Sequence, residues 1–181
     1  MTKHSGFDIV GASDITTSAF LRVEELRLTS PTGAEVRRTV VRHPGAVAVV
    51  ALDGDDFVLI RQYRAPIDSM ILEIPAGKLD VPGEDLEEAA RRELEEEVGL
   101  RSRVMELLAS VWTAPGFTDE RISIYLASDV EAVAARPHGA EEEVAEVVRI
   151  PKADVPAMLA NNEFEDAKTI VGLQAALARL A

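Results

Sequence analysis

The chain has 181 residues, which is enough for one catalytic domain with an N-terminal appendage but short for two independent domains. Its 32 acidic and 19 basic residues give a net charge of −13, which repels polyphosphate backbones and anionic lipid surfaces, so neither nucleic acid nor membrane is an expected partner. With no cysteine, no signal-peptide pattern and no apolar run longer than Ala46 to Leu52, which is too short to span a bilayer, we expect a cytoplasmic protein with a small ligand.

The N-terminal part of the sequence predicts a hairpin behind an irregular arm. Residues 1–18 are mixed and polar with no clear period, so we expect a flexible or partner-dependent arm. Strand-like patterns at residues 19–28 and 35–42 flank a turn composition at Ser30–Gly33, which is typical of a β-hairpin. This hairpin contains no apolar core large enough to stand alone.

The rest of the chain alternates strand patterns with three helical stretches. Strands are predicted at residues 45–52, 57–62, 71–75, 104–111, 122–127 and 144–150. Helices are predicted from Gly83–Glu84 to Val98–Gly99, at residues 152–161 and at residues 167–180. Strands around one strongly marked helix, with further helices at the C-terminus, indicate an α/β fold: an α/β/α sandwich around a mixed β-sheet, with the hairpin arm in front.

The first helix places carboxylates where its apolar stripe should continue. On a helical wheel Glu93 and Glu97 lie inside the stripe that contains Leu86 and Leu94, and Glu96 lies at its border. Burying an unpaired carboxylate is costly, so acids that converge beside a core usually have a cation between them. The alternative is a solvated acidic face whose ion-pair partners are the neighbouring arginines, and the wheel alone leaves the two interpretations near even.

The segment from Glu84 to Leu100 resembles the Nudix box. Glu84, seven residues and then Arg92-Glu-Leu-Glu-Glu-Glu-Val-Gly-Leu100 match every fixed position of the pattern G-x5-E-x7-R-E-U-x-E-E-x-G-U, where U is aliphatic. The departure is Gly77, which precedes Glu84 by six intervening residues instead of five. The extra residue falls in a Pro-Gly turn that can absorb it.

The resemblance implies a metal site on this helix. Glu93 and Glu97 are expected to bind a divalent metal ion, Glu96 to bind it or to orient a water ligand, and Arg92 to hold the glutamates. The carbonyl of Ala76, just before the box, is the implied backbone ligand. Oxygen ligands of this kind favour Mg²⁺, with Mn²⁺ possible.

Residues outside the box resemble the ADP-ribose pyrophosphatases within this family. The similar segments, which together cover roughly residues 19 to 150, are Arg37–Ala48, Ile60–Arg64, Leu72–Gly77 and a proline-bearing loop, Ala114–Glu120, in which Pro115 lies fifteen residues beyond Leu100. The resemblance implies that Arg64 contacts phosphate and that Pro115, Gly116 and Glu120 shape the substrate site. It also implies that the hairpin contributes Arg38 to the ligand site, either of its own chain or of the second chain in a homodimer. For Arg64 the alternative is an ion pair with Glu73.

On this basis the chain divides into residues 1–42, an arm for dimerisation and substrate contact, and residues 43–181, a catalytic domain. The position of the acidic triplet before residues 144–150 resembles the family's glutamate-bearing loop, so Glu142 is the expected general base, with Glu141 second and Glu96 next. The alternative for the triplet is solvated surface.

Three aromatic residues are candidates for stacking on a base, although core packing is the expected role of Trp112, Phe117 and Phe20. The predicted activity is Mg²⁺-dependent hydrolysis of the pyrophosphate bond of ADP-ribose to AMP and ribose 5-phosphate. One alternative is the same reaction on another nucleoside diphosphate sugar. The other is a non-catalytic Nudix module that senses ADP-ribose.

Overall fold

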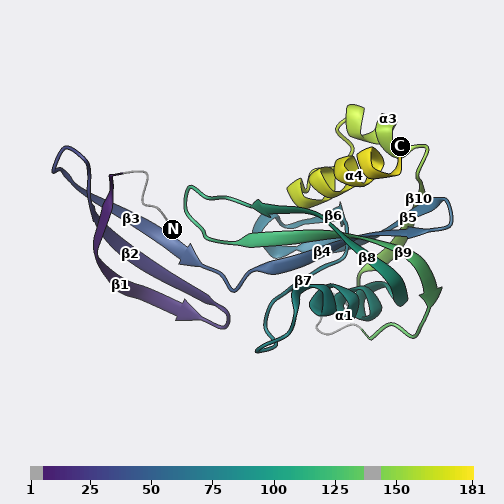
Figure 1. The fold of residues 1–181 in the computed structure, drawn as a ribbon, viewed down its shortest axis with the longest axis horizontal. Helices are drawn as coiled ribbons and strands as arrows, with labels where there is room; N and C mark the ends of the chain where they lie inside the picture. The colour runs from purple at the N-terminus through teal and green to yellow at the C-terminus, as the bar shows by residue number, and fades with distance from the viewer. Residues whose placement is uncertain (1–5, 137–143) are drawn as a thin grey trace. The chain divides into compact units, whose positions relative to one another are not determined.

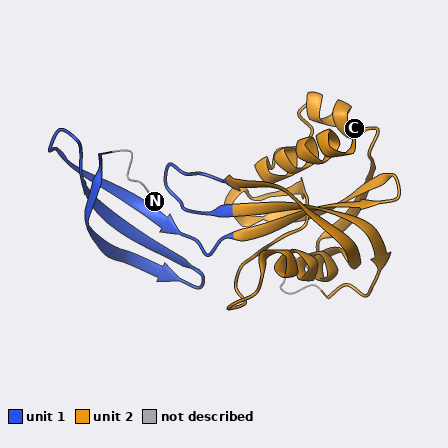
Figure 2. Cartoon of the chain, viewed as in Figure 1, with its two compact units in different colours: residues 1–45, 112–121 blue, residues 46–111, 122–181 orange. Residues whose placement is uncertain are grey.

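The computed structural model describes residues 6–136 and 144–181 and divides the chain into two compact units (Figures 1 and 2). Unit 1 contains residues 1–45 and 112–121, and unit 2 contains residues 46–111 and 122–181. The proline-bearing loop therefore groups with the N-terminal strands. Among the described residues, no helix is both long enough and apolar enough to cross a membrane.

Unit 1 is built on an antiparallel sheet of three strands in the order β1-β2-β3. These are β1 (Asp8–Ser18), β2 (Leu21–Thr29) and β3 (Glu35–Arg42). The hairpin predicted at residues 19–42 is present as β2 and β3, with Gly33 at φ 83° in the turn. The loop of unit 1 joins this sheet, because Phe117 accepts a backbone hydrogen bond of 2.8 Å from Val41.

Residues 8–18 form β1, so the expectation of a flexible arm at residues 1–18 is wrong for this part, whereas the alternative of a partner-dependent arm stays a prediction. The register of β1 against β2 shifts between Ile9 and Gly11 and again between Asp14 and Thr16. Each shift inserts one extra residue into the strand, so the side chains do not alternate with a constant period of two. The two irregularities therefore conceal the strand from a search for periodicity.

Unit 2 is a mixed sheet in the order β10-β5-β4-β9-β8, with β6 paired to β5 and β7 paired to β4. Its strands are β4 (Ala46–Asp53), β5 (Asp56–Arg64), β6 (Ser69–Glu73), β7 (Ala76–Lys78), β8 (Leu100–Trp112), β9 (Arg121–Ala132) and β10 (Glu146–Pro151). The pair β4 and β9 is parallel, and β4 is antiparallel to β5 and β7. Its helices are the short η1 (Ala65–Ile67), α1 (Leu86–Val98), α3 (Val155–Ala160) and α4 (Ala167–Leu180).

Helices cover both faces of this sheet, α1 on one side and α3 and α4 on the other (Figure 1). Alternate residues of β4 enter two separate cores: Ala48 and Val50 pack in the cluster that contains Leu173 of α4, whereas Val47 and Val49 pack in the cluster that contains Leu94 of α1. A strand that is buried on both faces must be apolar throughout, which explains the unbroken run from Ala46 to Leu52. The predicted α/β/α sandwich with a mixed sheet is confirmed.

Helix α1 begins and ends at residues that the sequence marks. Asp85 caps its N-terminus, with Oδ1 accepting a hydrogen bond of 2.9 Å from the backbone N–H of Glu87. The first helical residue is therefore Leu86, two positions after the predicted start at Glu84. Gly99 ends the helix at φ 65°, where a Cβ would lie 2.8 Å from the carbonyl oxygen of Val133.

Candidate functional site

Arg92 binds three of the glutamates of α1 and its preceding turn. Its Nε and Nη2 donate to the two carboxylate oxygens of Glu84 at 2.9 and 3.0 Å. Its Nη1 donates to Glu93 at 2.8 Å and to Glu96 at 3.1 Å. The resemblance implied that Arg92 holds the glutamates, and these charge-assisted bonds provide the contacts for that role.

The charged state of this cluster is stabilised by the same contacts. The hydrogen bond from Arg92 lowers the pKa of the Glu84 carboxyl below its usual value, and the bond to Glu84 raises the pKa of the Arg92 guanidinium. One guanidinium therefore pairs with three carboxylates, those of Glu84, Glu93 and Glu96, which leaves an excess of negative charge. An excess of this kind favours binding of a cation.

Strand β7 fits against two glutamates of α1. Glu93 is only 9% exposed, and a Cβ added to Gly77 would lie 1.9 Å from its carboxylate carbon. Glycine at position 77 therefore leaves the space that the Glu93 carboxylate occupies. Beside it, the backbone N–H of Ala76 donates to Oε2 of Glu97 at 2.8 Å. Strand β7 and helix α1 are thus joined through two predicted metal ligands.

The chemistry of these groups fits a divalent metal ion, because carboxylate and carbonyl oxygens are the ligands that hard cations prefer. In the structure their oxygens do not gather around one point: within residues 6–136 and 144–181, no three His, Cys, Asp or Glu side chains are placed to hold an ion together. Glu93 and Glu96 hydrogen-bond Arg92, and Glu97 hydrogen-bonds Ala76. The metal-ligand roles of Glu93, Glu96, Glu97 and the Ala76 carbonyl stay predictions.

A second group of charges surrounds Arg64 at the end of β5. Its Nε and Nη2 each donate to Glu73 at 2.6 Å, so the ion pair weighed as an alternative to a phosphate contact is present. Lys168 of α4 also contacts the Glu73 carboxylate. Burial would raise the pKa of Glu73, but the hydrogen bonds and charges of Arg64 and Lys168 outweigh it and lower the pKa below its usual value. The phosphate role of Arg64 stays a prediction.

Unit 1 contains a cavity of about 300 Å³ that brings together three of the predicted substrate residues. Arg38 reaches it from β3, and Pro115 and Gly116 reach it from the loop. Its other lining residues are Leu26, Leu28, Val40, Arg42, Phe117, Thr118 and Asp119. Apolar walls with a small number of charged groups are typical of a site for a small molecule.

Glu120, the last of the predicted substrate residues in the loop, contacts other residues of unit 1. Its Oε2 accepts a 2.7 Å hydrogen bond from Thr113, and Oε1 lies 3.5 Å from Nε2 of His43. Asp119 accepts 2.9 Å hydrogen bonds from Arg42 and from the backbone N–H of His43. The loop is therefore fixed at both of its acidic residues.

The three aromatic candidates are not core residues. Trp112, Phe117 and Phe20 are all exposed, so the expectation that they pack in the core is wrong. Trp112 lies under the Arg121 guanidinium, 5.5 Å from its ring centroid, and Phe20 meets His43 edge-on. Of the three, Phe117 lines the unit 1 cavity.

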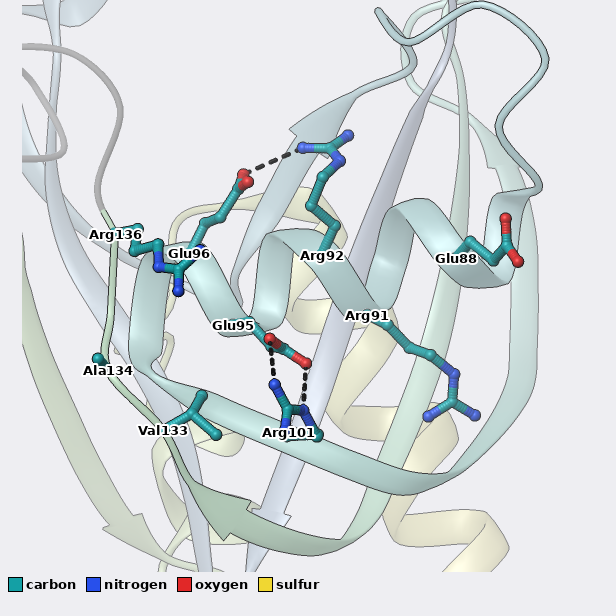
Figure 3. Close-up of a pocket in the computed structure, with 9 residues that line it drawn as sticks. All are labelled: Glu88, Arg91, Arg92, Glu95, Glu96, Arg101, Val133, Ala134 and Arg136. Carbon is teal, nitrogen blue, oxygen red and sulfur yellow. Dashed lines mark hydrogen bonds and ion pairs between the residues drawn. The ribbon is translucent and has the colours of Figure 1, made fainter.

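A larger cavity, of about 420 Å³, opens beside α1 (Figure 3). It is lined by Glu88, Arg91, Arg92, Glu95, Glu96, Arg101, Val133, Ala134 and Arg136. Arg101 and Arg136 were not predicted as site residues. Arg101 directly follows the box and pairs with both oxygens of Glu95 at 2.7 and 3.1 Å, which its position gives no means of predicting. The backbone N–H of Arg136 donates to the carbonyl of Glu96 at 3.0 Å, so the chain after β9 runs beside the box.

Glu141 and Glu142, the two candidates for the general base on this loop, lie outside the described residues. Their roles stay predictions. The third candidate, Glu96, lies in the α1 cluster, where it accepts the hydrogen bond from Arg92.

An α/β/α sandwich with a mixed sheet, and a helix whose glutamates are bound by one arginine, together define a hydrolase fold of the Nudix type. The NUDIX domain model matches residues 41–171, and the chain therefore belongs to the Nudix family. Enzymes of this family act with a divalent metal ion, in keeping with the carboxylates of α1.

Named relatives cover most of the chain. The ADP-ribose pyrophosphatase of Bacillus subtilis (strain 168) is 37% identical over 155 residues, which are 85% of this chain and 82% of that protein. The methanol dehydrogenase activator of Bacillus methanolicus is 38% identical over 155 residues, with the same coverage of 85% and 82%. A crystal structure of an ADP compounds hydrolase matches with a TM-score of 0.82 at 30% identity, covering 96% of this chain and 94% of that one.

Proposed function

We propose that this Nudix hydrolase cleaves the pyrophosphate bond of ADP-ribose to AMP and ribose 5-phosphate, using Mg²⁺. The observation that carries the proposal is the α1 cluster, in which Arg92 binds Glu84, Glu93 and Glu96 beside β7. The substrate is supported by relatives that are named as an ADP-ribose pyrophosphatase and an ADP compounds hydrolase.

Glu93, Glu96, Glu97 and the carbonyl of Ala76 are the residues that would hold Mg²⁺. When bound, the ion would offset the charge of the diphosphate and acidify a water molecule. Arg92 would then keep Glu84 charged and orient the glutamates. The hydrogen bond from Ala76 N–H to Glu97 ties the helix to the backbone segment that supplies the proposed carbonyl ligand.

Substrate recognition is assigned to both units. Arg64 contacts the diphosphate, and Arg38, Pro115, Gly116 and Glu120 shape the site for the nucleotide. The cavity of unit 1 supports this assignment, because Arg38, Pro115 and Gly116 line it together with the exposed ring of Phe117. A guanidinium beside an apolar wall suits a ligand with both a planar base and a phosphate.

The general base is Glu142, with Glu141 as the second candidate and Glu96 as the next. The proposal is supported by chain position: the backbone of Arg136 is hydrogen-bonded to Glu96, and Glu142 follows six residues later in the sequence. A positioned carboxylate within reach of a bound water can accept its proton during attack on phosphorus.

Unit 1 is proposed to form a homodimer with a second copy of this chain. Its edge strand β1 carries the exposed apolar residues Ile9, Val10 and Ile15, and Phe7 and Phe20 are exposed at either side of it. An exposed apolar edge strand is a surface for pairing with another chain. Replacing Ile9 and Ile15 with Glu should halve the mass measured by light scattering, whereas a wild-type chain that is already monomeric would contradict the proposal.

The matched activity test is phosphorus NMR of the products formed from ADP-ribose in ¹⁸O-labelled water with Mg²⁺. AMP and ribose 5-phosphate are expected, with one product carrying the label.

Glu97→Gln keeps the size of the side chain but removes a ligand charge. Loss of a group that only supports a metal ligand lowers activity by up to about 100-fold, so loss of the ligand charge itself should lower turnover by at least that factor. If Glu97→Gln keeps wild-type turnover at limiting Mg²⁺, Glu97 is not a metal ligand.

The alternatives separate in the same assay. A substrate panel of ADP-ribose, GDP-mannose and nucleoside triphosphates distinguishes another nucleoside diphosphate sugar from ADP-ribose. Binding of ADP-ribose without any hydrolysis would indicate a sensing module, an outcome made relevant by the relative named as a methanol dehydrogenase activator.

A further inference from the structure

Lys168 occupies a position that is unfavourable for a cation. It lies in the first turn of α4, directly after the N-terminal cap Asp166 and Ala167, where the helix dipole disfavours positive charge. Its side chain is only 10% exposed, so the ammonium group has also lost most of its contact with water. A buried cation at this end of a helix requires specific anionic partners.

Two carboxylates are those partners. Nζ of Lys168 lies 3.0 Å from Oδ2 of Asp166 and contacts Oε2 of Glu73. Glu73 is 1% exposed and already forms two 2.6 Å bonds with Arg64, so it receives two cations. Arg64 and Lys168 together balance the charges of Glu73 and Asp166, and Lys168, which contacts both carboxylates, has the further role of holding Glu73 in place.

The geometry of Arg64 indicates what that role is. Glu73 takes the Nε and Nη2 side of the guanidinium, while the Arg64 side chain remains 35% exposed. Within the part of the chain that the structure describes, no hydrogen bond from Nη1 of Arg64 is present. The negative charge of Glu97, a proposed metal ligand, also acts on Arg64. Arg64 is therefore within electrostatic reach of Glu97.

We propose that Lys168 is a positioning residue, which clamps Glu73 so that Glu73 fixes the guanidinium of Arg64 with its Nη1 edge presented to the substrate diphosphate. The inference rests on the proposed function, in which Arg64 contacts that diphosphate. Fixing the guanidinium before substrate binds removes the cost of ordering a flexible side chain, so its effect appears in substrate affinity.

A purely structural role is the competing explanation, because the same turn of α4 also anchors the helix to the sheet. Thr169 accepts a 2.9 Å hydrogen bond from the backbone N–H of Ile74 and donates a 2.6 Å bond to Asp166. Thr169→Val removes these bonds with little change of shape and leaves Lys168 and Glu73 in place. It is the matched control for loss of anchoring.

The experiment compares kcat and KM for ADP-ribose at saturating Mg²⁺ in the full chain. Lys168→Met should raise KM about tenfold, the effect of losing one charge-assisted hydrogen bond, with a much smaller change in kcat. Thr169→Val should lower the melting temperature and leave KM unchanged. Where Lys168→Met does not fold, Lys168→Gln, which keeps a hydrogen-bond donor but no charge, takes its place with the same expected direction.

A coupling test decides whether Lys168 acts through Glu73. In the Glu73→Gln background, Lys168→Met should add little further increase in KM, because both substitutions break the same clamp. Additive effects on KM, or a KM effect of Thr169→Val as large as that of Lys168→Met, would overturn the inference.

Arg64→Met separates the inference from the proposed function. If KM rises in Arg64→Met but not in Lys168→Met, the contact of Arg64 with the diphosphate is supported and only the role of Lys168 is rejected. An unchanged KM in Arg64→Met removes both assignments, and a wild-type chain without ADP-ribose hydrolysis denies the proposed function itself.

Discussion

The two units of this chain hold themselves together in different ways. Unit 2 has two buried apolar clusters, one on each face of its sheet, and both contain residues of β4. In unit 1 the described side chains are mostly exposed, with Leu26 as its buried apolar side chain. Unit 2 thus provides a rigid core on which charged groups can be placed accurately, whereas unit 1 depends more on polar contacts.

The polar contacts of unit 1 centre on Arg42. Its Nε donates to Glu24 at 2.7 Å and its Nη1 donates to Asp119 at 2.9 Å, which joins β2, β3 and the loop. Glu24 is buried, and Arg22 is its second cation. In unit 2 the buried Glu73 and Glu93 also contact arginine, but they lie on elements that the apolar core already fixes. We therefore expect variants of the metal-site residues and of the proposed base in unit 2 to change turnover, and variants in unit 1 to change affinity and local stability.

The largest expected effect belongs to the proposed base in unit 2. Glu142→Gln should lower kcat by about 10² to 10⁴-fold with little change in metal affinity, because a base moves a proton and does not bind the ion. Glu141→Gln is the matched control, and kcat is compared across pH at saturating Mg²⁺. Wild-type rates in both variants would mean that the acidic triplet before residues 144–150 is solvated surface, and Glu96 would be the next candidate for the base. An effect of Glu141→Gln alone would move the assignment by one residue.

Gly77→Ala tests how closely unit 2 positions its carboxylates. The new Cβ would overlap the Glu93 carboxylate, which lies at the end of a flexible side chain, so the fold should survive while Glu93 is displaced. We expect kcat to fall by about 10 to 100-fold, as when a metal ligand is misoriented.

Gly116→Ala is the control in unit 1, because nothing lies within 4 Å of a Cβ at that position. Because Gly116 is assigned to substrate recognition and not to the metal site, any effect of this variant should fall on KM, and its kcat should equal that of the wild type. Equal kcat values for both alanine variants and the wild type would show that the position of Glu93 does not matter for turnover.

Arg38→Met tests the role of unit 1 in recognition. Losing one charged contact with the substrate should raise KM about tenfold and leave kcat nearly unchanged. Arg37→Met removes the same charge from the adjacent position of β3, whose side chain points to the opposite face and pairs with Glu25 at 3.0 Å. A similar rise of KM in both variants would indicate a general effect of charge and not a contact made by Arg38.

Much of unit 2 is predictable from the sequence because its signals are local. The apolar run of β4, the wheel that places Glu93 in the apolar stripe and the helix end at Gly99 each follow from a few neighbouring residues. The box also indicates the role of Arg92. The sequence does not show which residues of separate elements come into contact. The fit of Glu93 against Gly77 depends on how β7 packs on α1.

The features that escaped prediction join residues that are far apart in the chain or break a period. Lys168 and Glu73 are 95 positions apart, and Lys168 belongs to none of the segments that resemble the family. Strand β1 was concealed by its two register shifts. The unit 1 cavity joins Arg38 of β3 to Pro115 of the loop, and only the resemblance to a family suggested that these residues share a function.

The smallest expected effect concerns the stability of unit 1 and its dependence on pH. Burial would raise the pKa of Asp119, but hydrogen bonds from His43 N–H and from Arg42 outweigh it and lower the pKa below its usual value of 3.8. A carboxyl whose pKa is lower in the folded state stabilises that state above the unfolded pKa, and this contribution is lost as pH falls through the folded pKa. Because the Asp119 side chain is 39% exposed, screening by solvent limits its contribution to about 1 kcal/mol or less.

Asp119→Asn should therefore reduce the stability of unit 1 at pH 7, and the difference from the wild type should shrink as pH falls below 3.8 and disappear once Asp119 is protonated in the folded state as well. The chain provides separate probes for its two units. Its single tryptophan, Trp112, belongs to unit 1, whereas α1, α3 and α4 all belong to unit 2. In urea titrations the substitution should shift the transition seen by tryptophan fluorescence and leave the transition seen by helical circular dichroism in place. Equal shifts of both probes would mean that the two units unfold as one, and a loss of stability that does not shrink as pH falls would mean that the carboxylate charge of Asp119 is not its source.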